Sequence, residues 1–187
     1  EIREKYGLEK DGYILFLARL VPEKGLHYLI EAYKEIDTDK KLVIAGGSSH
    51  SFDYMKQVQE MAASDERIIM TNFVQGRVLE ELYSNAYVFV LPSDVEGMAL
   101  TLLEAMSYGD CCLVSDIPEN IEVVENEAVT FRKGSVEDLK KKLVFLLENP
   151  EITADYGRKS VDFICNKYSW EEMVRQTRML YENTDCK

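Results

Sequence analysis

The chain has 187 residues, of which 46% are hydrophobic and 30% charged, a composition typical of a globular domain with a substantial core. Its formal net charge of −12 at pH 7 disfavours a general role on nucleic acids or anionic membranes, because both would repel it. Any phosphate-bearing ligand must therefore be held by groups placed locally for that purpose.

The cysteines and the apolar runs further limit the classes of protein to which the chain can belong. The four cysteines show neither metal-ligand spacing nor a disulfide framework, so we expect free thiols in a reducing cytoplasm. No apolar run approaches the ~18 residues that a membrane span requires. Because the chain begins with Glu1 rather than Met and its first predicted strand starts at Tyr13, we expect a domain excised from a longer protein. The cysteines are Cys111, Cys112, Cys165 and Cys186.

Short apolar runs alternate along the chain with segments whose apolar residues recur at helical spacing. After a helix-like lead-in over Glu1–Asp11, the runs predict strands at Tyr13–Ala18, Lys41–Ala45, Arg67–Thr71, Tyr87–Leu91, Cys111–Ser115 and Ala128–Phe131. The helical spacing predicts helices at Leu26–Ile36 and Phe52–Ala63, one marked by Val78, Leu79, Leu82 and Tyr83, and others at Met98–Tyr108, Val136–Glu148, Ile152–Lys167 and Trp170–Asn183.

This alternation predicts an α/β fold, a Rossmann-like doubly wound parallel sheet of about six strands with helices on both faces and extra C-terminal helices. No linker rich in Pro, Gly or Ser interrupts it, so residues 1–187 are expected to form a single domain. The last three helices follow without strands between them, and we expect them to pack around the sheet or to reach toward something else. Sheets of this kind bind ligands outside the carboxyl ends of their strands, where the distinctive loops of this chain fall.

Two of those loops could hold a phosphate-bearing ligand. Arg19 and Lys24 flank the first strand–helix connection and suit a diphosphate, with the positive end of the helix near Gly25 beside them. Two solvated surface charges are the alternative interpretation. Gly46-Gly47, after the second strand, would let a ligand approach the backbone closely, although a plain turn explains this pair equally well. No P-loop or dinucleotide-binding motif occurs.

The stretch Tyr87–Gly109 combines strand, loop and helix and contains two carboxylates. Its helix carries no polar stripe, so Glu104 is expected to be buried, either paired with a neighbour or accepting two hydroxyls of a sugar ring. Glu96 stands eight residues earlier, where the loop meets the helix. Eight helical steps separate two residues by about 80° and roughly 12 Å, so both can line one cleft without touching each other.

The remaining polar candidates in these loops are weaker. The N–H groups at the start of the helix, those of Met98, Ala99 and Leu100, offer an anion site. His27 is predicted to be a surface residue. His50 lies in a loop where it could contact a ligand, but nothing in the sequence requires that contact. No Ser-His-Asp set and no cluster of metal ligands stands out in the sequence.

The motifs occur in a fixed order: Arg19…Lys24-Gly25, Gly46-Gly47 and Pro92-Ser93…Glu96-Gly97…Leu103-Glu104-Ala105-Met106…Gly109. In this order and spacing, over nearly its whole length, the chain closely resembles the nucleotide-sugar-binding, C-terminal half of group 1 retaining glycosyltransferases with the two-domain GT-B architecture. The resemblance implies catalytic roles for Arg19, Lys24 and Glu96, the two cations holding the donor's diphosphate. It further implies donor-binding roles: Glu104 would hold the ribose, Glu96 and the backbone of Gly97, Met98, Ala99 and Leu100 would meet the sugar and diphosphate, Gly46 would border the site, and Val74 and Gly76 would lie beside the base.

The same resemblance implies a reaction. A sugar would pass from a UDP- or GDP-linked donor to a hydroxyl acceptor with retained configuration, without metal or cofactor, in polysaccharide, glycolipid or cell-surface glycan synthesis. The enzyme would be cytoplasmic and would approach the inner face of a membrane only through its N-terminal Rossmann-like half, which holds the acceptor site and is missing here. The last helix would return toward that half, and the isolated domain is expected to be inactive.

Two features leave alternatives open. Met98-Ala99 stands where many members have Phe-Gly, and Asp110-Cys111-Cys112 replaces a common Pro-Val pair, so the resemblance assigns no sugar. One alternative function is a non-catalytic module that binds nucleotide-sugars or partner proteins. The other is a sugar-nucleotide epimerase of related fold, which the E-x(7)-E helix disfavours.

Overall fold

Six apolar runs form one parallel sheet in the computed structural model, which describes residues 1–47 and 51–182. The strand order is β3-β2-β1-β4-β5-β6, so the order in which strands are added reverses between β1 and β4. The strands are β1 (Tyr13–Leu17), β2 (Lys41–Ala45), β3 (Ile68–Asn72), β4 (Val88–Leu91), β5 (Cys112–Ser115) and β6 (Val129–Phe131).

The predicted Rossmann-like architecture is confirmed, and each predicted strand is present. The bounds of β2 match the prediction, and those of the other strands differ by one residue at one or both ends. Side chains on either face of the sheet enter separate apolar clusters, Ile14 and Phe16 in one, Tyr13 and Leu15 in the other. Burial on both faces is why these strands read as continuous apolar runs rather than alternating ones.

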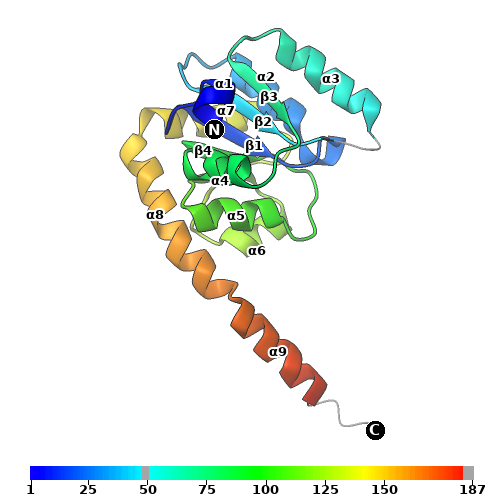
Figure 1. Cartoon of the computed structure of the whole chain (residues 1–187), viewed down its shortest axis with the longest axis vertical. Helices are drawn as coiled ribbons and strands as arrows, with labels where there is room; N and C mark the ends of the chain where they lie inside the picture. The colour runs from blue at the N-terminus through cyan, green and yellow to red at the C-terminus, as the bar shows by residue number, and fades with distance from the viewer. Residues whose placement is uncertain (48–50, 183–187) are drawn as a thin grey trace.

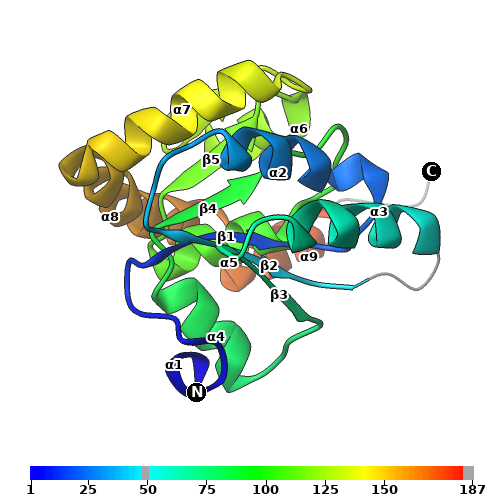
Figure 2. The same cartoon turned by 90° about the horizontal axis from the view of Figure 1, so that it is seen from above.

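Helices cover both faces of the sheet (Figures 1 and 2). On one face lie α2 (Leu26–Lys34), α3 (Phe52–Ala63) and α7 (Val136–Glu148). On the other lie α1 (Ile2–Tyr6), α4 (Arg77–Ser84), α5 (Leu100–Tyr108), α6 (Pro118–Val124) and α8 (Pro150–Lys167). Sequence periodicity did not predict α6, because seven residues that begin with a proline span too few turns to show a repeat. A short 3₁₀ turn, Pro22–Lys24, was expected to be plain loop.

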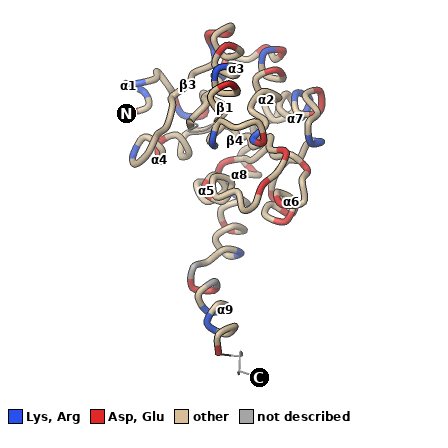
Figure 3. The backbone as a smooth tube through the Cα atoms, turned by 90° about the vertical axis from the view of Figure 1, so that its right-hand side faces the viewer, with Lys and Arg blue, Asp and Glu red and all other residues tan. Residues whose placement is uncertain are grey.

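Of the last three predicted helices, α7 and α8 pack against the domain and α9 (Trp170–Glu182) extends away from it (Figure 1). Its predicted last residue, Asn183, lies outside the described residues. Acidic and basic residues of α9 lie along the same projecting helix (Figure 3). None of the helices in the described part of the chain combines the length and apolarity of a bilayer-spanning helix. The most exposed large apolar side chains of α9 are Val174, Leu180 and Tyr181.

A buried carboxyl group lies at the amino end of β5. Asp110 is 4% exposed, and its Oδ2 atom has no hydrogen-bond donor among the described residues. Burial, reinforced by the nearby charge of Asp11, raises the pKa of Asp110 well above its usual range. The neighbouring thiols are free and buried, and burial raises the pKa of Cys111 to about 12. Cys165 is free and exposed, and Cys186 lies outside the described residues.

Candidate functional site

The loops that follow β1 and β4 touch each other where the strand order reverses. Gly25 has a φ of +65°, and a Cβ atom there would lie 2.0 Å from the carbonyl oxygen of Pro92. Only glycine therefore permits this approach of the two backbones. A second link joins the loops, because the Asp94 N–H donates to the Glu23 carbonyl at 2.8 Å. The close contact brings the cationic end of one loop to the carboxylate of the other.

Lys24 and Glu96 form a buried ion pair across these loops. Lys24 Nζ lies 2.6 Å from both carboxylate oxygens of Glu96, and Ser93 Oγ donates to Oε1 at 2.6 Å. The two side chains are 15% and 4% exposed, respectively. The sequence suggested separate roles for the two residues, whereas the structure joins them. Glu96 is thus a buried carboxylate of this site, with three charge-assisted hydrogen bonds to hold it.

Glu104 is exposed, and the prediction that it is buried was wrong. The apolar residues around it misled the prediction, because Leu100 is 63% exposed and Leu103 is half-buried. They line a surface groove instead of entering the core. Glu104 Oε2 accepts a hydrogen bond of 2.9 Å from the hydroxyl of Tyr83, a residue of α4. Glu96 and Glu104 share no hydrogen bond within the described residues. The helix begins only at Leu100, so the spacing predicted from eight helical steps does not apply to this pair.

Tyr83 is a candidate site residue that the sequence did not single out. Its side chain is 1% exposed, and its ring stacks on that of Tyr108 with centroids 5.3 Å apart. Burial, together with the hydrogen bond to Glu104, raises the pKa of Tyr83 above its usual range, so the hydroxyl stays a donor at neutral pH. Nothing in the sequence pointed to this contact, because it joins neighbouring helices and depends on how they pack.

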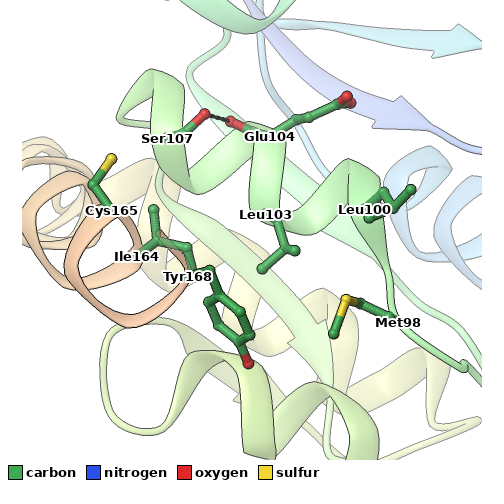
Figure 4. A pocket seen from close by; sticks show the side chains of 8 residues that line it. All are labelled: Met98, Leu100, Leu103, Glu104, Ser107, Ile164, Cys165 and Tyr168. Carbon is green, nitrogen blue, oxygen red and sulfur yellow. Dashed lines mark hydrogen bonds between the residues drawn. The ribbon is translucent and has the colours of Figure 1, made fainter. Parts of the chain in front are cut away.

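A mostly apolar pocket of about 450 Å³ lies between α5 and the end of α8 (Figure 4). In the close view, Leu103 points toward Tyr168, whereas the Glu104 carboxylate points away from both. The pocket therefore adjoins the carboxylate without enclosing it. Its lining residues are Met98, Leu100, Leu103, Glu104, Ser107, Ile164, Cys165 and Tyr168.

The start of α5 offers fewer N–H groups than expected. The Leu100 N–H donates to the Met98 carbonyl at 3.0 Å, which removes it from the predicted anion site. The N–H groups of Met98 and Ala99 donate to no acceptor within the described residues, so these two fit the prediction. Gly97, just before them, is exposed, and no atom lies within 4 Å of where its Cβ would be. An open segment of backbone thus leads into the helix.

The other predicted residues lie at the carboxyl ends of β1, β2 and β3. Arg19 is exposed, and its side chain has no ion-pair or hydrogen-bond partner among the described residues. Gly46 has a φ of +142°, and a Cβ there would lie 1.9 Å from the Ala18 carbonyl, so close backbone contact alone explains this glycine. Val74 is half-buried against the core, and Gly76 is exposed before α4. These two lie beyond β3, at the edge of the sheet.

Of the two histidines, only His27 lies in the described part of the chain. His27 was predicted to be a surface residue, but it is half-buried, and its Nδ1 lies 2.9 Å from the Tyr54 hydroxyl. Burial lowers the pKa of His27. His50 lies outside the described residues. No group of three or more His, Cys, Asp or Glu side chains arranged to hold a metal occurs in residues 1–47 and 51–182.

Comparison with known proteins links the chain to sugar-transferring enzymes. A family model described as "Glycosyl transferases group 1" matches residues 1–183. An uncharacterised glycosyltransferase of Methanocaldococcus jannaschii is 30% identical over 191 residues, covering 96% of this chain and 47% of that protein. O-antigen chain mannosyltransferase B of Escherichia coli is 27% identical over 188 residues, covering 97% of this chain and 48% of the other. The chain spans about half the length of these relatives.

A solved structure shares the fold. Anabaena HepE, crystallised in complex with UDP and glucose, matches with a TM-score of 0.89 at 18% identity. The match covers 97% of this chain and 51% of HepE. At this identity the similarity establishes the architecture alone, and it again corresponds to about half of a longer chain.

Proposed function

This chain belongs to the group 1 glycosyltransferases, and we propose that it is the donor-binding, C-terminal half of such an enzyme. The complete enzyme takes a sugar from a UDP- or GDP-linked donor and transfers it to a hydroxyl acceptor with retention of anomeric configuration. The observation that carries the proposal is the buried ion pair of Lys24 and Glu96 where the strand order reverses. Arg19 and Glu104, from the same two strand–helix connections, are exposed to a ligand. Open parallel sheets bind nucleotides at this point of reversal.

In this proposal the cations of the site stabilise the leaving group. The barrier lies in breaking the bond between the anomeric carbon and the diphosphate, so negative charge grows on the phosphate oxygens. Lys24 has three N–H donors, and its contacts to the two oxygens of Glu96 leave one for a phosphate. Arg19 precedes Lys24 by five residues, and Met98 and Ala99 follow Glu96 by two and three. The Arg19 side chain and the N–H groups of Met98 and Ala99 are further donors for the phosphates. Such preorganised donors act without rearrangement as the charge develops.

The exposed carboxylate suits the nucleoside. A carboxylate can accept from two vicinal hydroxyls, and Glu104 is accessible to a ribose in a way that a buried residue would not be. Tyr83 fixes one of its oxygens, which lowers the entropy lost when a ribose is bound. Val74 and Gly76 then border the base, with Gly46 between them and the diphosphate. Glu96 holds Lys24 in place, and the exposed backbone of Gly97 beside it faces the sugar.

The proposal assigns the acceptor to a second half of the protein. The chain spans about half of its relatives, and the apolar side chains exposed on α9 support a contact with a further domain. We propose that this N-terminal Rossmann-like half binds the acceptor and closes the sugar pocket. The chain by itself is then expected to bind the donor weakly and to transfer no sugar.

A product assay tests the proposed function. Full-length protein is incubated with a panel of UDP- and GDP-linked sugars and hydroxyl acceptors, and NMR of the products reads the anomeric configuration. We expect transfer from one donor class with retained configuration. Inverted products would contradict the mechanism. Binding of UDP or GDP without transfer to any acceptor would favour the non-catalytic module instead.

A further inference from the structure

A row of buried polar groups leads from Glu96 across the ends of β4 and β5 to α6. Ser93, which donates to Glu96, accepts at its carbonyl a hydrogen bond of 2.5 Å from Ser115 Oγ. Asn120 Nδ2 donates to Ser115 Oγ at 3.1 Å and to the Ser115 carbonyl at 3.2 Å. Each of these residues is at most 1% exposed. We call Ser93, Ser115 and Asn120 the buried relay.

The direction of every bond in the buried relay is determined by chemistry. The carbonyl of Ser115 can only accept, so the amide nitrogen of Asn120 must face it. The carbonyl of Ser93 also only accepts, so the Ser115 hydroxyl donates to it and accepts from Asn120. Ser93 Oγ in turn donates to the Glu96 carboxylate. The Ser115 hydroxyl both accepts and donates, so its two bonds strengthen each other. These bonds end at the backbone of Ser93, and the separate hydroxyl of Ser93 holds Glu96.

Folding stability alone does not account for Asn120. Its Oδ1 atom is buried and has no hydrogen-bond donor among the described residues. A half-satisfied buried amide is less favourable than an apolar side chain of similar size. The amide nitrogen of Asn120 makes both of its hydrogen bonds in the buried relay, and both go to Ser115. Ser115 in turn bonds the loop that carries Glu96.

We infer that Asn120 and Ser115 are positioning residues, which hold the loop after β4 so that Glu96 and Lys24 keep the geometry that binds a nucleoside diphosphate. The inference rests on the proposed function and adds to it two residues that contact no ligand themselves. The loop from Pro92 to Ala99 has no helix or strand to fix it, so its position depends on such contacts. A functional group held loosely loses affinity because the site must be ordered on binding.

Calorimetric titration of the full-length protein with UDP and with GDP tests the inference. Asn120→Leu and Ser115→Ala each remove two hydrogen bonds of the buried relay, and because neither residue contacts the ligand, each is expected to weaken binding of the nucleotide that the protein accepts by only roughly fivefold. Ser115→Thr retains the hydroxyl and is expected to restore most of the affinity. The unfolding midpoint of Asn120→Leu should change little, because loss of the two bonds to Ser115 is offset by removal of the unpartnered oxygen. Combining Asn120→Leu with Ser93→Ala should weaken binding no further than the stronger single change, because both act through Glu96.

Two control variants separate this inference from a structural effect and from the proposed function. Ser160→Ala removes another fully buried hydroxyl, whose nearest acceptor is the Gly157 carbonyl at 2.8 Å, and should lower the unfolding midpoint without changing affinity. Arg19→Ala should weaken nucleotide binding, because Arg19 belongs to the proposed diphosphate site. If Arg19→Ala weakens binding and the relay variants do not, the inference is overturned and the proposed function stands. If neither nucleotide binds the wild type, or Arg19→Ala has no effect, the proposed diphosphate site is overturned, and the inference with it.

Discussion

The two carboxylates of the Glu96–Glu104 segment differ in exposure and in hydrogen bonding. At the loop end, Glu96 is 4% exposed and bonded to Lys24 and Ser93. At the helix end, Glu104 is exposed and bonded to a single tyrosine hydroxyl. The same residue type thus serves in one region as part of a closed framework and in the other as an open group available to a ligand. Burial therefore distinguishes the two roles: the buried carboxylate keeps the site in its geometry, and the exposed one is accessible to a ligand.

Breaking the closed end should have the largest effect. Lys24→Met leaves Glu96 as a buried charge without its main partner, which is expected to cost about 3 kcal/mol of unfolding free energy. It should also reduce transfer by the full-length enzyme at least about 100-fold. Urea denaturation measures the first effect. The double variant Lys24→Met with Glu96→Gln should recover most of the stability and none of the activity.

An exposed pair of the same residue types provides the control for that experiment. Lys140 Nζ, on α7, lies 2.8 Å from Oε2 of Glu35, the residue that follows α2, and the two side chains are 36% and 64% exposed. Lys140→Met should change the unfolding free energy by less than about 1 kcal/mol, because solvent screens this pair. A loss equal to that of Lys24→Met would show that burial of the Lys24–Glu96 pair has no energetic importance.

Changing the open end should affect affinity rather than stability. Glu104→Leu is expected to weaken UDP or GDP binding by about 30-fold, the effect of losing hydrogen bonds to a charged group. Because Glu104 is exposed, the unfolding free energy should move by about 1 kcal/mol at most, through the hydroxyl of Tyr83. Glu60→Leu, an exposed change on α3, is the control for surface charge. Unchanged affinity with altered stability would give Glu104 a structural role instead.

A third carboxyl group sharpens the contrast, because Asp110 is buried like Glu96 but has an oxygen without a partner. Its raised pKa favours the protonated form in the folded state, so its contribution to stability is largest below its unfolded pKa and is lost as pH rises. The unfolding free energy of Asp110→Asn should therefore exceed that of the wild type by about 1–2 kcal/mol at neutral pH, and by less toward pH 4. Denaturation from pH 4 to 8 measures this, with the exposed Asp162→Asn as a control. A difference in unfolding free energy between Asp110→Asn and the wild type that becomes smaller as pH rises would contradict the expectation.

The smallest effect is expected from the support of the open carboxylate. Tyr83→Phe removes the bond to Glu104 while keeping the stacked ring, and should raise the donor KM by about threefold with little change in kcat. Tyr13→Phe is the matched control, because its buried hydroxyl bonds the Leu82 carbonyl of the helix that carries Tyr83 at 2.7 Å and not the Glu104 carboxylate. Equal KM changes in both variants would assign the effect to general destabilisation.

The sequence predicted the sheet well and parts of the site poorly, for one physical reason. Strand positions follow from short apolar runs, a local property, and these appeared within a residue of where they were expected. The exposure of Glu104 depends on whether another element covers Leu100 and Leu103, which no local pattern records. The helix α6 and its Asn120 were missed because seven residues carry no readable period. The sequence indicated that a helix starts near Gly25, but not that the Pro92 carbonyl packs directly against this glycine.

The class of fold, the order of its elements and the family motifs could be predicted from the sequence, because each is recognised from short runs of neighbouring residues. Which carboxylate is buried, the pairing of Lys24 with Glu96, and the contacts of Tyr83, Ser115 and Asn120 emerged from the folded structure. Those contacts join residues between 5 and 72 positions apart. They exist because parallel strands bring the loops at their carboxyl ends to one edge of the sheet, where distance along the chain no longer governs which side chains meet.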